Sequence, residues 1–210
     1  MNRVLYIKAS PRTGRSYSVA VADAFVESYC QIHPDDEIKT IDIFKVKLPA
    51  FDFGVVSAKY KIMHNEEHSQ TERRLWGRIV SVIEEFKSAD KYVMAVPMWN
   101  FSIPYRLKQY IDIIVQPTYT FTVNKEGNYE GLVKGKPMFI AYARGGEYPP
   151  GSGAEVFDLQ KRYLEVILGF MGFSGIRSVV VEPTLAGGVG VAKEKCNAAV
   201  ERAKQMAAEF

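Results

Sequence analysis

The 210-residue sequence has only two cysteines, Cys30 and Cys196, which lie near opposite ends of the chain and form no C-x-x-C motif. This scarcity excludes a disulfide-stabilised secreted fold and a dithiol redox motif. The sequence also lacks an apolar run of about 18 residues, so no membrane-spanning helix is expected. The apolar run before Lys8 is too short for a signal peptide, so a cytoplasmic protein is predicted.

The sequence also lacks a large excess of charge of either sign, because 27 lysines and arginines are scattered among 24 aspartates and glutamates. The net charge is +3, and without a long basic run nucleic acid is not an expected partner. Two nucleotide-binding motifs are missing: Gly135-Lys136 is followed by a proline and completes no Walker A loop, and there is no G-x-G-x-x-G. The stretch "HNEEH", from His64 to His68, matches an inverted zinc-protease pattern, but it is polar and has no third ligand, so no metal is predicted.

Short apolar runs that alternate with helical patterns fill most of the chain. The apolar runs span residues 4–7, 92–96, 138–142 and 176–181, and a segment at 37–42 alternates as a strand does. The helical patterns span about 16–31, 71–87, 104–115, 154–170 and 189–210. This alternation predicts an α/β fold: a doubly wound, five-stranded parallel sheet with helices on both faces. We expect one domain over residues 1–210, with an irregular excursion at 44–70.

The loop after the first expected strand is rich in hydroxyl groups. It carries Ser10, Thr13, Ser16 and Ser18, with two arginines nearby. Ligands of open parallel sheets bind beyond the carboxyl ends of the strands, which is where this loop lies. Ser16 at a helix start would leave free backbone N–H groups, and these with the hydroxyls suit a phosphate monoester. The alternative is ordinary helix capping by a serine.

The loops after the third and fourth long strands are unusual in different ways. The segment "VPMWNFSIP" begins at Val96 and places Trp99 at a strand end, where a planar heteroaromatic ring could cover it. The alternative is that Trp99 fills the core below the loop. The segment "YARGGEYPPGSG" begins at Tyr142 and offers Gly145-Gly146 for close backbone approach to a ligand. Arg144 or nearby N–H groups could stabilise negative charge there, and the alternative is a plain glycine turn.

Together the three loops resemble those of the FMN-dependent NADH:quinone oxidoreductases, also called FMN-dependent azoreductases, which have a flavodoxin-like fold. The motifs that carry the resemblance are Ser10 with Ser16-Tyr17-Ser18, the run Pro97 to Phe101, and Arg144-Gly145-Gly146. By this resemblance, three groups of residues bind FMN: Ser10, Ser16, Tyr17 and Ser18 at the phosphate, Met98, Trp99, Asn100 and Phe101 along the ring, and Ala143, Arg144, Gly145 and Gly146 at its pyrimidine edge.

The resemblance also implies an activity and an assembly. It implies a ping-pong enzyme that transfers two electrons from NADH or NADPH to quinones and reductively cleaves azo compounds, with no side chain required as a catalytic acid or base. It implies a homodimer with the flavin site at the interface, where Tyr119 and Phe121 line the acceptor pocket. The sequence departs from the usual family residues at several positions. Trp99 occupies the place of a frequent tyrosine, Ala143 that of a common serine and Ile167 that of a pocket aromatic, and Pro11-Arg12 makes the phosphate loop more basic than usual.

Two other functions stay open from the residues alone. A flavodoxin-like electron carrier would share the fold, although such carriers are strongly acidic and this chain has a net charge of +3. A non-catalytic FMN-binding module, or a module that binds no flavin, would also share it. The segment 119–129 resembles a pocket wall and favours the enzyme.

Overall fold

The computed structural model describes residues 1–12 and 14–210 and has a five-stranded parallel sheet at its centre. The strands lie in the order β2-β1-β3-β6-β7, and all neighbouring pairs are parallel. Their bounds are β1 Arg3–Lys8, β2 Glu37–Asp42, β3 Lys91–Pro97, β6 Met138–Ala143 and β7 Ile176–Val181. The predicted strands are therefore confirmed, and the strand order reverses direction between β1 and β3.

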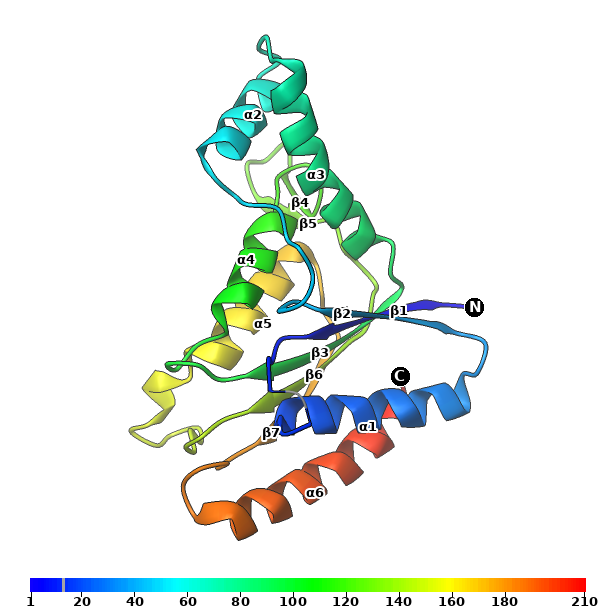
Figure 1. The fold of residues 1–210 in the computed structure, drawn as a ribbon, viewed down its shortest axis with the longest axis vertical. Helices are drawn as coiled ribbons and strands as arrows, with labels where there is room; N and C mark the ends of the chain where they lie inside the picture. Colours follow the sequence, from blue (N-terminus) through cyan, green and yellow to red (C-terminus); the bar gives the residue numbers. More distant parts are fainter. Residues whose placement is uncertain (13) are drawn as a thin grey trace.

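Helices cover both faces of this sheet, as predicted (Figure 1). On one face lie α1 (Tyr17–Ile32) and α6 (Gly188–Ala207). The other face is covered by α3 (Gln70–Lys87), α4 (Tyr105–Ile114) and α5 (Leu159–Met171). This is the doubly wound arrangement of the flavodoxin-like fold. In the part of the chain that the structure describes, no helix combines the length and the apolar character needed to span a bilayer.

The continuous apolar runs of the strands follow from this double cover. In β1, Val4 and Tyr6 belong to the core under α1 and α6, whereas Leu5 and Ile7 belong to the core under α3, α4 and α5. All four side chains are at most 2% exposed, because successive residues of a strand point to opposite faces. Both faces are buried, so both sets must be apolar.

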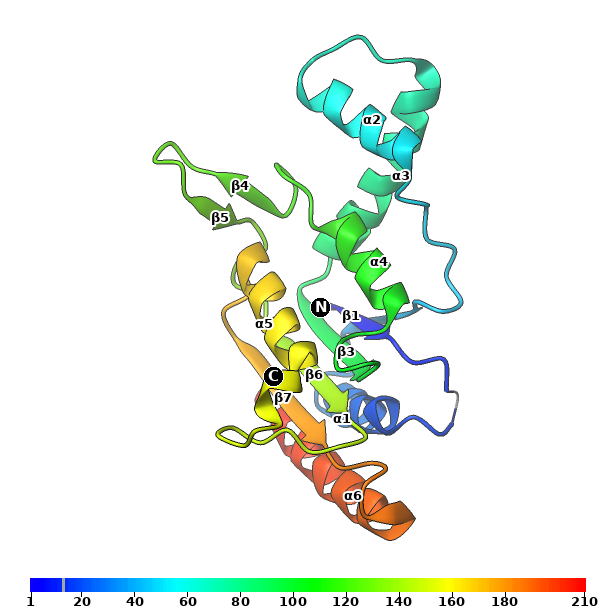
Figure 2. The ribbon, with the colours of Figure 1, turned by 90° about the vertical axis from the view of Figure 1, so that its left-hand side faces the viewer.

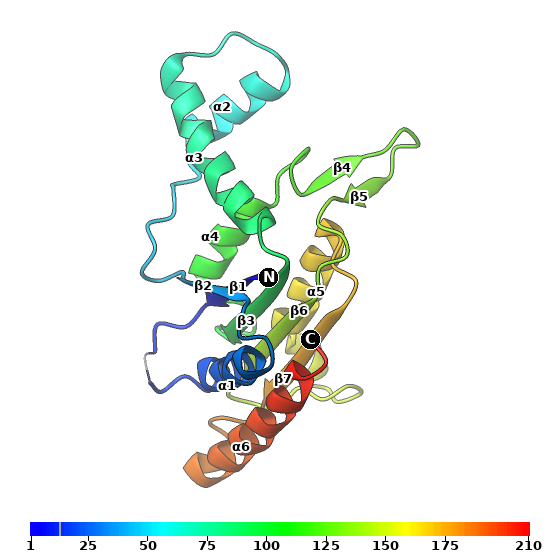
Figure 3. The ribbon, with the colours of Figure 1, turned by 90° about the vertical axis from the view of Figure 1, so that its right-hand side faces the viewer.

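The excursion at 44–70 is more regular than the sequence predicted. It contains a helix, α2 (Phe53–Met63), whose start is capped by Asp52 accepting from the N–H of Val55 at 3.1 Å. The helix packs against α3, and the pair projects away from the sheet (Figure 3). Only Val55 and Ala58 of α2 are buried, so its sequence carries no clear apolar period.

Two further features differ from the sequence prediction. The helix expected from about residue 154 begins at Leu159, after a 3₁₀ turn at Glu155–Phe157, because the Asp158 side chain caps its first turn. A short antiparallel hairpin of β4 (Phe121–Val123) and β5 (Tyr129–Gly131) was not expected. Its strands are too short to give a recognisable alternation.

The contact between β5 and the end of α5 generates a prediction about stability. A Cβ at Gly131 would overlap the backbone of Met171 and Gly172, which cannot move like a flexible side chain. We expect Gly131→Ala to lower the free energy of unfolding by about 1–3 kcal/mol and the melting temperature by about 2–4 °C for each kcal/mol. Gly175→Ala is the control, since a Cβ there meets nothing within 4 Å. Equal melting temperatures for the two variants would contradict the prediction.

Candidate active site

The three loops singled out in the sequence lie at one edge of the sheet (Figure 2). The carboxyl ends of β1, β3 and β6 are neighbours in the strand order, so the loops that follow them are neighbours too. Backbone hydrogen bonds join them: the Ala9 N–H donates to Ala95 at 2.9 Å, and the Met98 N–H donates to Ala143 at 2.8 Å. The strand order therefore brings the three predicted regions together.

In the first loop, Ser16 occupies the N-cap position of α1 as predicted, but its side chain makes no capping hydrogen bond to the described residues. Its Oγ lies 3.2 Å from the Oγ of Ser18 instead. Ser10, at the start of the same loop, accepts from the N–H of Arg12 at 3.4 Å, and all three serines are at most 8% exposed. Ordinary capping thus does not account for Ser16. Thr13, the fourth hydroxyl residue of this loop, lies outside the described residues.

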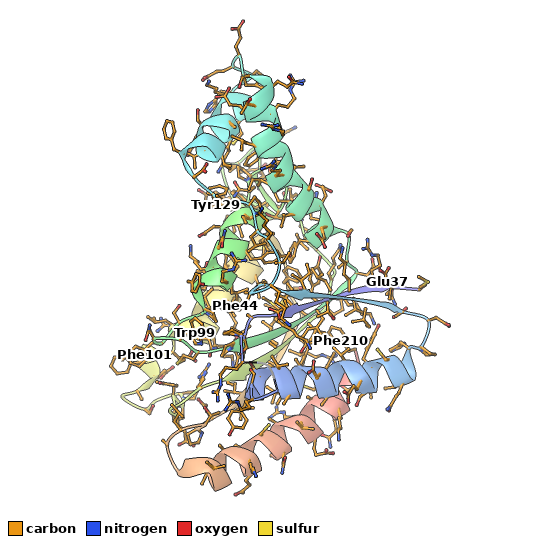
Figure 4. All side chains as sticks on the ribbon, in the orientation of Figure 1. Glu37, Phe44, Trp99, Phe101, Tyr129 and Phe210 are labelled. Carbon is orange, nitrogen blue, oxygen red and sulfur yellow. The ribbon has the colours of Figure 1, made fainter. Side chains whose placement is uncertain are left out.

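The second loop is a tight turn that presents two aromatic rings. Trp99 and Ser102 exchange two backbone hydrogen bonds of 2.9 Å, and between them Asn100 and Phe101 have φ values of 47° and 67°. Positive φ at two successive residues is the pattern of a type I′ turn, which glycine and asparagine favour and phenylalanine does not. Trp99 is 36% exposed and Phe101 45% exposed, at the same edge of the molecule (Figure 4). Such local strain often accompanies a binding site.

The Trp99 ring also packs against two aromatic side chains of the same chain, which partly supports the alternative that it fills space under the loop. Its ring centroid lies 5.6 Å from that of Phe44 and 6.3 Å from that of Tyr105. Phe44 and Tyr105 meet edge to face at 5.9 Å. One part of the Trp99 indole is therefore fixed by two aromatic rings while the rest is open to solvent. The sequence analysis did not include Phe44 and Tyr105, because they lie in an excursion and at a helix start.

The third loop differs from expectation at Arg144, whose side chain is turned into the protein and is only 3% exposed. Its guanidinium pairs with Asp158 at 2.8 Å and with Glu182 at 3.3 Å. Its Nε donates to the side-chain oxygen of Gln160 at 3.1 Å. Arg144 thus anchors α5 and the end of β7. This geometry does not support direct contact between the guanidinium and a ligand at the edge.

The two glycines after Arg144 are confined by their neighbours. A Cβ at Gly145 would lie 2.9 Å from Leu185, and one at Gly146 would lie 3.2 Å from the Tyr148 hydroxyl oxygen. The backbone N–H groups of Gly145 and Gly146 have no acceptor among the described residues. Ala143, just before Arg144, is 8% exposed. The backbone N–H groups of this loop, and not the buried guanidinium of Arg144, are what can donate to a ligand.

A cleft of about 850 Å³ adjoins the turn on the side of α4, and this volume is typical of small-molecule sites. Trp99 and Asn100 line one end of it, and Lys59 and Tyr163 line other walls. Burial lowers the pKa of the Lys59 ammonium group. Burial, followed by the charge of Asp112, raises the pKa of Tyr163 to about 12.

Tyr119 and Phe121, the predicted acceptor-pocket residues, are not near the turn of the same chain. Tyr119 packs against Trp76 at 6.2 Å between ring centroids, and Phe121 lies 6.1 Å from Tyr129 on the hairpin. Figure 4 shows Tyr129 well separated from Phe101. The ten residues of α4 intervene, a length of about 15 Å. The structure therefore does not bring these two residues together with the other predicted ones within one chain.

The histidines of the zinc-like motif do not lie on one helix. His64 is the C-cap of α2, and His68 follows in the connection before α3. The His68 ring nitrogen Nδ1 lies 3.0 Å from the backbone oxygen of Glu66. Two histidines can share a metal when they lie four residues apart on one helix, and this segment does not place them so.

Comparison with known proteins gives full-length matches. The family described as "Flavodoxin-like fold" matches residues 2–207. The FMN-dependent NADH:quinone oxidoreductase of Nitratidesulfovibrio vulgaris (strain Hildenborough) is 54% identical over 210 residues, 100% of each chain. That of Desulfotalea psychrophila is 45% identical over 185 residues, 88% of this chain and 87% of its own.

Solved structures agree in fold over the same length. An azoreductase from Bacillus anthracis (strain Sterne) has a TM-score of 0.91 at 29% identity, with 100% of both chains covered. An FMN-dependent NADH-azoreductase from Bacillus anthracis (strain Ames Ancestor), solved in complex with FMN, has a TM-score of 0.86 at 29% identity. That match covers 99% of this chain and 100% of the other.

The position of Arg144 generates a second prediction about stability. Arg144→Leu would leave the buried carboxylate of Asp158 and the half-buried carboxylate of Glu182 without their cation. We expect a loss of about 3–5 kcal/mol in the free energy of unfolding, measured by urea denaturation. The control is Arg177→Leu, whose partner Glu209 is 78% exposed in its side chain, and there we expect a loss of about 0–1 kcal/mol. A loss as small for Arg144 as for Arg177 would show that the cluster does not anchor the loop.

Proposed function

The chain belongs to the FMN-dependent NADH:quinone oxidoreductases, and we propose that it acts on quinones and azo compounds in turn with NADH or NADPH at one site, by a ping-pong mechanism. The observation that carries this proposal is the meeting of three loops at the carboxyl edge of the sheet. One loop offers hydroxyls at a helix start, the second exposed aromatic rings, and the third free backbone donors. Residues 1–210, as one domain, would supply one chain's share of the site.

The first loop fits the phosphate end of FMN. Since Ser16 does not cap α1 within the described residues, its hydroxyl is available to a ligand, as is the positive end of the helix dipole. Ser18 is fully buried and contacts Ser16, so its part would be to orient the Ser16 hydroxyl or to donate once the pair separates. Tyr17, the first residue of α1, would contribute through its backbone N–H.

The other two loops fit the ring of FMN. Met98 is half-buried, and Trp99 and Phe101 are exposed, so together they offer an apolar surface suited to a planar ring. Asn100 and the N–H groups of Gly145 and Gly146 would donate to its polar atoms. The two-electron chemistry between NADH and the acceptor is that of FMN when it is bound. The residues of the chain bind the group, orient it and exclude water, and none is assigned as a catalytic acid or base.

The proposed enzyme is a homodimer. Tyr119 and Phe121 lie beyond the far end of α4, so they could line an acceptor pocket only over the ring held by a second copy. Apolar side chains on the neighbouring surface support such pairing, since Val166 of α5 is 71% exposed and Tyr129 of the hairpin is 69% exposed. The free thiols Cys30 and Cys196 fit a reducing compartment, and we place the enzyme in the cytoplasm.

The role assigned to the first loop can be tested with two ligands. We expect the double variant Ser16→Ala/Ser18→Ala to bind FMN about 10- to 100-fold more weakly, because a hydrogen bond to a charged group is worth about 1.5–3 kcal/mol. Riboflavin, which has the same ring and no phosphate, should bind the variant and the wild type alike. Titration of flavin fluorescence measures both affinities. An equal loss of affinity for FMN and riboflavin would show that this loop does not bind the phosphate.

The reaction order is tested by steady-state kinetics. The sequence has no separate dinucleotide fingerprint, so NAD(P)H and the acceptor should use one site and exclude one another. We expect parallel double-reciprocal lines when the NADH concentration is varied at several fixed quinone concentrations. Intersecting lines would reveal a ternary complex and contradict the shared site.

A further inference from the structure

A buried amide joins the two loops that we assign to the flavin ring. Gln160, the second residue of α5, is 0% exposed, and both ends of its side chain are used. Its Nε2 donates to the backbone oxygen of Val96 at 3.0 Å. Its Oε1 accepts from Nε of Arg144 at 3.1 Å. Val96 lies two residues before Met98, and Arg144 directly precedes Gly145, so the amide links the carboxyl ends of β3 and β6.

The packing of α5 alone does not require an amide at this position. The helix buries residues 160, 164, 168 and 171 against the sheet, and the last three are Leu164, Leu168 and Met171. The period of these positions predicts an apolar residue at 160 as well. A buried polar group costs free energy unless it is hydrogen-bonded, so its presence is explained by the two bonds that it makes.

The far end of the amide is attached to a fixed point. Arg144 pairs with Asp158 at 2.8 Å, and Asp158 also accepts from the N–H of Lys161 at 3.0 Å as the cap of α5. Arg144 pairs with Glu182 at 3.3 Å as well. The loop after β6 is thus held firmly against α5 and β7. Gln160 is the member of this buried cluster that reaches across to β3, whose end leads into the Trp99 turn.

We propose that Gln160 is a positioning residue for the flavin ring, which sets the spacing between the Met98–Phe101 turn and the Gly145-Gly146 loop. The inference rests on the proposed function, since it takes the ring to lie at these two loops. Gln160 contacts no ligand itself in this arrangement. It acts through the backbone of β3 and through the side chain of Arg144.

Gln160→Met tests the proposal, because methionine has similar length and volume but neither a strong donor nor a strong acceptor. We expect the full-length variant to bind FMN about tenfold more weakly, since two hydrogen bonds that orient the ring loops are lost. Riboflavin affinity should fall by the same factor. A change confined to FMN would overturn the proposal, because it would place the effect at the phosphate. Unchanged affinity for both flavins would overturn it as well.

Gln160→Glu provides a readout that a purely structural role would not move. A protonated carboxyl group can donate to Val96 and accept from Arg144, whereas a carboxylate can only accept. The charged groups around it are Arg144, Asp158 and Glu182. Arg144 would lower the pKa of a carboxyl group at this position, whereas burial and the two carboxylates that already share the guanidinium would raise it, and we expect the raising effects to prevail. Riboflavin affinity of this variant should therefore rise towards that of the wild type as the pH falls from about 8 to 5.

The matched controls separate the possible causes. Gln160→Met measured over the same pH range corrects for every other titrating group, so the ratio of the two variants isolates residue 160. Ile83→Ala removes a buried side chain of α3, away from the loops, and should lower the melting temperature without changing riboflavin affinity below it. If Gln160→Met does not fold, the pH profile of Gln160→Glu decides, and a flat profile overturns the proposal. Failure of the wild-type protein to bind either flavin would contradict the proposed function itself.

Discussion

Burial of both faces of the sheet is the constraint on which the rest of the molecule depends. Because helices cover each face, the interiors of the three central strands β1, β3 and β6 are apolar along their length, and in these strands polar residues occur only where the strands begin and end. Parallel strands all end at one edge. The hydroxyls of the first loop, the turn at Trp99 and the glycines after Arg144 therefore lie together although they are far apart in the chain. The position of the candidate active site is a consequence of how the core is covered.

The same constraint explains the charge cluster beneath the edge. A guanidinium that is 3% exposed must be compensated, and Arg144 has two carboxylates and an amide oxygen as partners. These partners come from the start of α5 and from the residue after β7, so the cluster attaches a loop to two elements at once. A loop made mainly of glycine and proline gains a defined shape from these side-chain contacts. Its backbone donors can then be presented to a ligand while the guanidinium of Arg144 stays turned into the protein.

The sequence alone predicts the parts of the structure that depend on period and on strand direction. Apolar runs and, for β2, an alternating segment predicted the five strands, and the parallel arrangement predicted that their loops would meet. It could not predict α2, which buries only Val55 and Ala58, or a hairpin with three-residue strands. Nor could it predict the direction of Arg144. The local sequence around an arginine after a strand is the same whether its side chain faces solvent or pairs with a carboxylate 38 positions further along the chain.

The division of labour between side chain and backbone follows from these observations. The open part of the edge is formed by the aromatic turn and by backbone N–H groups, whereas the guanidinium of Arg144 in the third loop is turned inward to hold that loop. Asn100 and Phe101 adopt positive φ at a cost, and this strained turn is tied through Trp99 to Phe44 and Tyr105 on one side. On the other side, β3 is tied through Gln160 to Arg144. A planar group at this edge would meet a surface whose shape is set before it binds, so little ordering free energy opposes binding.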